Sequence, residues 1–175
     1  MTFIFGSGGI GAGNFLRLKT VLKTIATSFG ISSKRSRASI VTFSDSSASV
    51  SASFESFTST KEFQDSLSSL TYKDKRGDIR LALKLAEKTV FPKARKGVAK
   101  IAVVVIDGRE NNNGQWQDSV LSLGKAGIRV LLLGIGSEIK RESLRKLVEK
   151  DDDLVIKDSF ITLLKEDRKS TRLNS

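Results

Sequence analysis

The chain has 175 residues, 39% of them hydrophobic and 28% charged, and this composition fits one soluble domain with its own core. It contains no Cys and no His, which excludes disulfides, thiol nucleophiles, the usual zinc sites and His-based catalytic triads. Lys and Arg outnumber Asp and Glu by 30 to 19, and the resulting net charge of +11 favours acidic partners.

The sequence disfavours nucleic-acid binding and membrane insertion. Nucleic-acid binding is not expected, because the basic residues are not interleaved with stacking aromatics and the chain has one Trp and one Tyr. Membrane insertion is not expected either, since the longest apolar runs, Ile101–Ile106 and Ile128–Ile135, are far too short to cross a bilayer.

Strands and helices alternate from the start of the chain. An apolar run predicts a strand over Thr2–Phe5, and a Gly-rich turn separates it from an amphipathic helix over Asn14–Phe29. A second apolar strand is expected over Ala38–Phe43. Three apolar residues that alternate with Ser then predict a half-buried, antiparallel edge strand: Val50, Ala52 and Phe54.

The middle of the chain continues the alternation. Ser59 and Glu62 form a capping-box pattern ahead of a short helix. Asp78 is the expected N-cap of a longer helix over Ile79–Val90. The β-branched run Ile101–Ile106 is typical of a central parallel strand that is buried on both faces.

The last third adds three helices and two strands. A helix over Trp116–Ala126 precedes a buried strand over Ile128–Gly134. A basic helix that carries Leu144, Leu147 and Val148 leads to a short strand over Leu154–Ile156. Asp158 is the expected N-cap of a final helix.

This alternation predicts an α/β fold with a doubly wound, mostly parallel sheet, helices on both faces and one antiparallel edge strand. Residues 1–167 are expected to form one domain, and the polar residues 168–175 a disordered or artefactual tail. Because residues 2–5 already have the character of a core strand, we expect the chain to be an internal piece of a longer secreted protein. Ligands of such sheets bind at the carboxyl ends of the strands.

Five motifs at these strand ends and helix starts resemble the von Willebrand factor A domain, in its extracellular-matrix, matrilin-like and collagen-associated variants. They are Gly6–Gly11, Asn14-Phe15, Val41–Asp45, Val103–Gly108 and Ala126–Gly136. The resemblance spans residues 2–164 and implies an extracellular adhesion module rather than an enzyme.

The resemblance also implies a divalent-ion site, which this chain has largely lost. In the family, an Asp-x-Ser-x-Ser turn, a Thr and a later Asp hold the ion. Here Ser7 and Asp107 keep two of these positions, whereas Phe5, Gly9 and Gly77 replace the first Asp, the second Ser and the Thr. We therefore expect no cofactor and no working metal site, because so few oxygen ligands cannot compensate the dehydration of Mg²⁺.

Weak Mg²⁺ binding through substituted ligands remains an alternative. The candidate substitutes from neighbouring loops are Asp74, Asp78 and Glu110. Ser7 and Asp107 also have a purely structural interpretation, because small and Asp-Gly residues after a strand commonly form turns.

The tripeptide Arg76-Gly77-Asp78 has the sequence that integrins recognise, which makes an integrin a possible partner. The competing and preferred interpretation is that Asp78 caps the following helix.

Four clusters of basic residues favour a heparin-like polyanion or an acidic matrix protein as a partner. Two of them lie within residues 73–76 and 140–146, and the other two are the candidate binding sites. They are Lys34, Arg35 and Arg37, and Lys93, Arg95 and Lys96. A solvated surface is the ordinary explanation of such clusters, but the large net charge favours polyanion binding.

The pattern Gly6-x-Gly8-x-x-Gly11 also fits a dinucleotide-binding turn. The acidic residue that should follow about twenty residues later is missing, so a nucleotide-binding enzyme is the least favoured alternative. The sequence predicts an adhesion or matrix-assembly module that binds collagen-like proteins or acidic polysaccharide, with metal-dependent adhesion and integrin recognition as alternatives.

Overall fold

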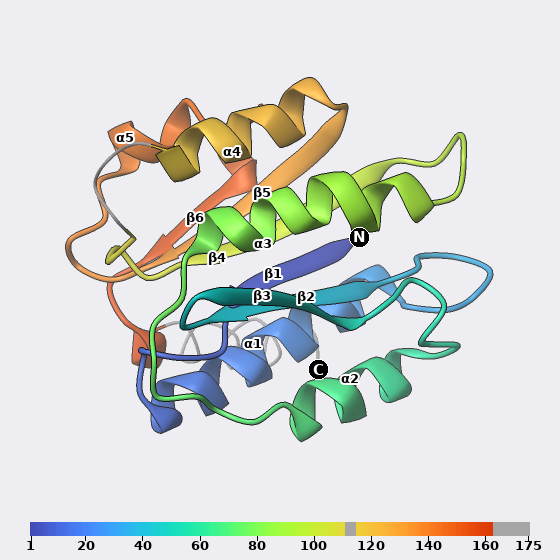
Figure 1. The fold of residues 1–175 in the computed structure, drawn as a ribbon, viewed down its shortest axis with the longest axis horizontal. Coiled ribbons are helices and arrows are strands. Elements are labelled where there is room, and N and C mark those ends of the chain that lie inside the picture. The colour runs from blue at the N-terminus through green and yellow to red at the C-terminus, as the bar shows by residue number, and fades with distance from the viewer. Residues whose placement is uncertain (111–114, 163–175) are drawn as a thin grey trace, which may run out of the picture.

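A computed structural model of the chain describes residues 1–110 and 115–162 and shows a three-layer α/β fold (Figure 1). The six strands are β1 (Thr2–Gly6), β2 (Ser39–Ser44), β3 (Ser47–Ala52), β4 (Lys100–Ile106), β5 (Ile128–Ile135) and β6 (Leu154–Lys157). The α-helices are α1 (Ala12–Phe29), α2 (Thr60–Ser69), α3 (Ile79–Leu85), α4 (Gln115–Lys125) and α5 (Arg141–Arg145).

The strands form one sheet in the order β3-β2-β1-β4-β5-β6, in which only β3 is antiparallel to its neighbour. The central strands β1 and β4 are mostly apolar because helices cover both of their faces. This arrangement confirms the predicted doubly wound sheet with one antiparallel edge strand.

Two apolar cores lie on opposite faces of the sheet, and Figure 1 shows α3 and α4 on one side and α1 and α2 on the other. Alternate residues of β4 divide between them, with Val104 in the core under α3 and α4 and Val103 in the core under α1 and α2. Leu22 of α1 and Val120 of α4 are fully buried in these two cores.

The edge strand differs from the simple alternation expected for Val50, Ala52 and Phe54. A β-bulge gives β3 an extra residue, so that Val50 pairs with Val41 while Ala52 pairs with Ile40. Neighbouring residues of β2 face opposite sides, and Val50 is therefore exposed whereas Ala52 is buried. Phe54 is buried but lies beyond the end of the strand.

Three predicted helices also need correction. The expected helix over Ile79–Val90 is α-helical only to Leu85 and continues as a π-helical turn over Ala86–Val90. The basic helix α5 is a short one, and Leu147 and Val148 follow it in a turn. The final helix begins at Phe160, one residue later than expected, because Ser159 rather than Asp158 accepts the Thr162 N–H.

The fold brings the loops after β1, β2 and β4 together at the carboxyl end of the sheet, where the winding direction changes between β1 and β4. The proposed tail, residues 168–175, lies outside the described residues, so the domain boundary stays a prediction. No helix in the described parts of the chain has the length and apolar character needed to cross a membrane.

Substitution of Gly77 tests how tightly these loops pack. A Cβ there would lie 2.6 Å from the backbone N and Cα of Ser44, and backbone atoms cannot move aside cheaply. We expect Gly77→Ala to lower the free energy of unfolding by about 1–3 kcal/mol in urea denaturation. The matched control is Gly124→Ala in α4, where a Cβ meets no atom within 4 Å and stability should be unchanged or slightly higher. Equal effects of the two substitutions would contradict the close packing.

Candidate functional site

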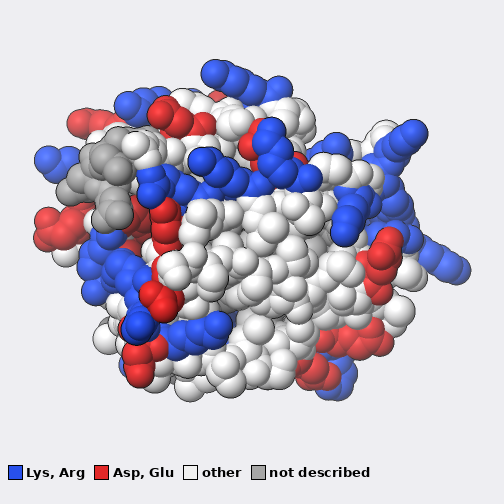
Figure 2. Space-filling view, in the orientation of Figure 1, with Lys and Arg blue, Asp and Glu red and all other residues white. Residues whose placement is uncertain are grey.

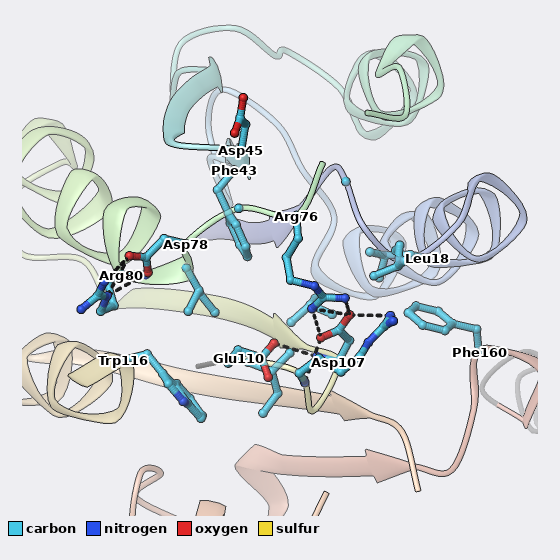
Figure 3. A pocket seen from close by; sticks show the side chains of 18 residues that line it. Leu18, Phe43, Asp45, Arg76, Asp78, Arg80, Asp107, Glu110, Trp116 and Phe160 are labelled. Atoms are coloured by element: carbon cyan, nitrogen blue, oxygen red, sulfur yellow. Dashed lines mark hydrogen bonds and ion pairs between the residues drawn. The ribbon is translucent and has the colours of Figure 1, made fainter. Parts of the chain in front are cut away.

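A pocket of about 270 Å³ lies at the carboxyl end of the sheet, between the loops that follow β1, β2 and β4 (Figure 3). Its centre holds the Asp107 cluster, which consists of Asp107, Arg76, Arg109 and Glu110. The cluster joins the end of β4 to the segment that precedes α3.

Glycines allow the loops around this pocket to approach backbone to backbone. The Lys73 N–H donates to the Ser7 carbonyl at 2.8 Å. A Cβ at Gly8 would lie 2.1 Å from the Lys75 carbonyl oxygen, and one at Gly9 would lie 2.8 Å from the Arg76 Cβ. The Gly-rich turn after β1 is therefore required by contact with this chain's own loop.

Arg76 joins both sides of the pocket through its guanidinium group. Its Nη1 donates to Asp107 Oδ1 at 3.0 Å, and its Nη2 donates to Asp107 Oδ2 at 3.2 Å. The same Nη2 donates to the Gly9 carbonyl at 3.1 Å. Figure 3 shows the Arg76 side chain pointing down into the pocket toward Asp107.

Asp107 has a second arginine partner. Arg109 Nη2 donates to Asp107 Oδ2 at 3.0 Å, and the Arg109 backbone N–H donates to Asp107 Oδ1 at 3.2 Å. Only 9% of the Asp107 side chain is exposed, so the carboxylate is held by these donors rather than by water. Burial alone would raise the pKa of Asp107, but hydrogen bonds and charge from Arg76, and then the charge of Arg109, hold that pKa below its usual range.

Glu110 is the other carboxyl group of the cluster. Its Oε1 accepts the Asp107 backbone N–H at 2.9 Å. Burial raises the pKa of Glu110 to about 6, with help from the negative charge of Asp107 and against the backbone hydrogen bond. Asp107 is thus firmly ionised, whereas Glu110 titrates close to neutrality.

The other family metal positions carry no free ligand. The Ser7 side chain is nearly buried, and its hydroxyl donates to the Phe43 carbonyl at 3.4 Å. Phe5 is fully buried, with its ring 6.5 Å from that of Phe15. Gly9 contributes its carbonyl to Arg76, and Gly77 packs on the Ser44 backbone.

The residues present do not fit a divalent ion. The described residues hold no group of three or more Asp or Glu side chains that could bind one. Asp78 is taken by a bidentate pair with Arg80, Asp74 is exposed, and Glu110 bonds to the backbone. The place between Asp107 and the β1 turn is filled by a guanidinium group, which is itself a cation.

The integrin-like tripeptide is not displayed as a free loop. Asp78 is the N-cap of α3 and accepts the Arg80 N–H at 2.9 Å, which confirms the capping interpretation. The hydrogen bonds and charge of Arg80 lower the pKa of Asp78 below its usual value, whereas burial acts in the opposite direction. Figure 3 shows Arg76 and Asp78 engaged with different partners, and this geometry argues against recognition by an integrin.

The dinucleotide pattern is also used internally. Gly8 lies against the backbone of Lys73 and Lys75, and the Gly11 N–H donates to the Tyr72 hydroxyl at 3.0 Å. The close approach that a pyrophosphate would need is therefore occupied by the chain itself.

The two basic clusters named from the sequence meet at the other end of the sheet. Arg95 donates from Nη1 to the Lys34 carbonyl at 3.5 Å and from Nη2 to the Arg35 carbonyl. Arg35, Arg37, Lys93 and Arg95 line a common pocket, while Lys34 and Lys96 are exposed beside it.

Sequence reasoning missed the function of Arg76 and did not name Arg109 at all. Arg76 was considered only as part of the integrin tripeptide and of a basic cluster. The sequence indicated only their positions at the carboxyl end of the sheet, where Arg109 follows β4 and Arg76 precedes α3. Position alone does not reveal a pairing across 31 residues.

The comparisons with known proteins agree on one family. Residues 3–168 match the model of the von Willebrand factor type A domain. The chain is 27% identical over 149 residues to the collagen alpha-1(XXI) chain of Xenopus laevis and 26% identical over 145 residues to that of Homo sapiens. Each match covers 83% of this chain but only 15% of the collagen chain.

Solved structures agree with this assignment at the level of the fold. Proximal thread matrix protein 1 from the mussel byssus superimposes with a TM-score of 0.82 at 21% identity, over 98% of this chain and 44% of the mussel chain. Another structure of that mussel protein, with a zinc-occupied MIDAS (metal-ion-dependent adhesion site) motif, gives a TM-score of 0.81. The predicted family is confirmed: this chain belongs to the von Willebrand factor type A domain family.

Proposed function

We propose that this chain is an extracellular adhesion or matrix-assembly domain, without enzymatic activity, that binds collagen-like proteins or acidic polysaccharide without a divalent ion. The observation that carries the metal-free part is the bridge from Arg76 to both Asp107 and Gly9. The family, the collagen relatives and the net charge of +11 support the matrix and polyanion parts.

The guanidinium of Arg76 does the electrostatic work of a metal ion. A cation that used Asp107 and the β1 turn would have to sit between them, and Arg76 already contacts both at 3.0–3.1 Å. Unlike Mg²⁺, a guanidinium group is covalently attached and gives up no tightly held water shell.

A divalent ion would also meet repulsion at this place. Two guanidinium groups, those of Arg76 and Arg109, face the single carboxylate of Asp107. An entering ion would have to displace Arg76 and still share Asp107 with Arg109. Glu110 could add a second carboxylate only by giving up its bond from the Asp107 backbone.

The direct test measures metal dependence in both stability and binding. We expect the thermal midpoint to be the same in Mg²⁺, in Zn²⁺ and in excess chelator, because a ligand stabilises a protein only if it binds the native state. Binding to immobilised collagen and to heparin should likewise not respond to chelator. A rise in the midpoint that chelator reverses would overturn the metal-free proposal. If the domain bound neither collagen nor heparin, the adhesive proposal would be overturned.

Removal of Arg76 should destabilise the domain through the carboxylate it leaves behind. Arg76→Ala takes two donors from a carboxylate that is 9% exposed, and we expect a loss of about 1–3 kcal/mol in urea denaturation. Lys75→Ala in the same loop is the control, because Lys75 pairs with Asp45 at 3.5 Å on the surface and should contribute less than about 1 kcal/mol. A harmless Arg76→Ala would mean that Asp107 does not depend on Arg76.

Glu110 predicts a pH dependence with a definite sign. Its pKa in the folded chain is raised from the ordinary 4.5 to about 6, so the folded state binds this proton more tightly than the unfolded state. The contribution of Glu110 to stability therefore rises as pH falls through about 6 toward 4.5.

The variant Glu110→Gln lacks this titration. Between pH 7 and pH 5 the wild-type chain should gain on the order of 1 kcal/mol relative to Glu110→Gln in chemical denaturation. Asp107, whose pKa is lowered, should stay ionised over this interval and contribute no change. A constant difference between the two proteins would show that Glu110 is not perturbed, as expected if a cation held it ionised.

A further inference from the structure

A second pocket, of about 240 Å³, lies at the amino end of the sheet, away from the Asp107 cluster. It is called the basic pocket here, after the five cationic residues in its lining: Arg35, Arg37, Lys93, Arg95 and Lys100. No Asp or Glu is among its lining residues, and Glu55, which follows the lining residue Phe54, stays outside it.

The fold assembles this pocket from segments that lie about sixty residues apart in the chain. The link between them is Arg95, whose guanidinium donates to the carbonyls of Lys34 and Arg35 and so ties the loop after Lys93 to the loop before β2. Figure 1 places both loops at the right-hand end of the molecule, and Figure 2 shows basic side chains gathered along that edge, with acidic ones beside them.

The cations of the basic pocket lack carboxylate partners. Within residues 1–110 and 115–162, none of the five takes part in a salt bridge. The arginines at the opposite end behave differently, since Arg76, Arg80 and Arg109 each pair with an Asp. Uncompensated like charges around one concave surface raise the local positive potential and favour an anion there.

The floor of the pocket is apolar. Phe54 and Phe91 are 7% and 2% exposed, and their ring centroids lie 6.4 Å apart. Val98, which is 42% exposed, adds an aliphatic wall. The exposed Val98 side chain beside a cationic rim suits a ligand that has both a carbon-rich face and anionic groups, as a sulfated sugar ring has. The buried Phe rings offer little of the exposed aromatic surface on which nucleic-acid bases stack.

We propose that the basic pocket binds a sulfated polysaccharide of the heparin type, with sulfate groups held by the rim cations. This inference rests on the polysaccharide part of the proposed function and names its surface. Lys34 and Lys96, exposed beside the pocket, extend the contact along the polymer.

The test compares two double variants that remove the same charge at different places. Arg35→Ala with Lys93→Ala removes two cations from the rim of the pocket, at exposed residues whose side chains have no hydrogen bond or ion pair described for them. It leaves Arg95, which joins the two loops, unchanged. Lys140→Ala with Lys146→Ala, next to α5, is the matched control at exposed positions outside the pocket. The probe is a heparin octasaccharide, titrated at several salt concentrations by calorimetry, with urea denaturation to verify folding.

We expect the pocket variant to bind about tenfold more weakly, with the slope of log K against log salt reduced by about two, and the control to change less than about twofold. Equal weakening by both variants would overturn the pocket, because net charge alone would then explain binding. Equal binding of desulfated heparin, single-stranded DNA or anionic vesicles would overturn the ligand class. If heparin binding fails while collagen binding persists in chelator, this inference falls and the metal-free adhesive proposal stands.

Discussion

Asp107 directly follows the central strand β4, and its carboxylate is almost inaccessible to water. A buried carboxylate of this kind needs a positively charged partner. Arg76 supplies it, and the other departures from the family metal motif agree with that solution. Gly9 leaves room for the Arg76 side chain and gives its carbonyl to the guanidinium. Gly77 lets the same loop lie on the backbone of Ser44. Position 5 holds a fully buried Phe in place of a carboxylate.

The fold followed from the sequence because its determinants are local and periodic. The run over β4 and the apolar stripe of α1 each specify an element within one stretch of chain, and the order of elements then restricts the topology. The errors lie where several local solutions have similar energy. Ser159 and Asp158 are both good N-caps, and a bulge in β3 costs little at the edge of a sheet.

The candidate site was predictable only in part, because its chemistry depends on contacts between distant residues. The aligned motifs predict that Phe5, Gly9 and Gly77 replace metal ligands, but nothing in the sequence places Arg76 on Asp107. The Arg76-Gly77-Asp78 tripeptide suggested Asp78 as an integrin ligand, whereas the preference of Asp for helix N-caps predicted its position correctly. The basic clusters were visible as charge, but the hydrogen bonds of Arg95 that join them cross about sixty residues.

The two ends of the sheet differ in how their charges are compensated. At the carboxyl end, Arg76, Arg80 and Arg109 each pair with an Asp carboxylate. At the amino end, the cations of the basic pocket are not paired within the described chain, and their field reaches about one Debye length, some 8 Å at physiological salt. A single pocket of this kind binds a sulfate group weakly, but a polysaccharide carries many, and each bound group raises the effective concentration of the next. Under the proposed function, the polymeric form of the ligand would thus supply affinity without a metal ion.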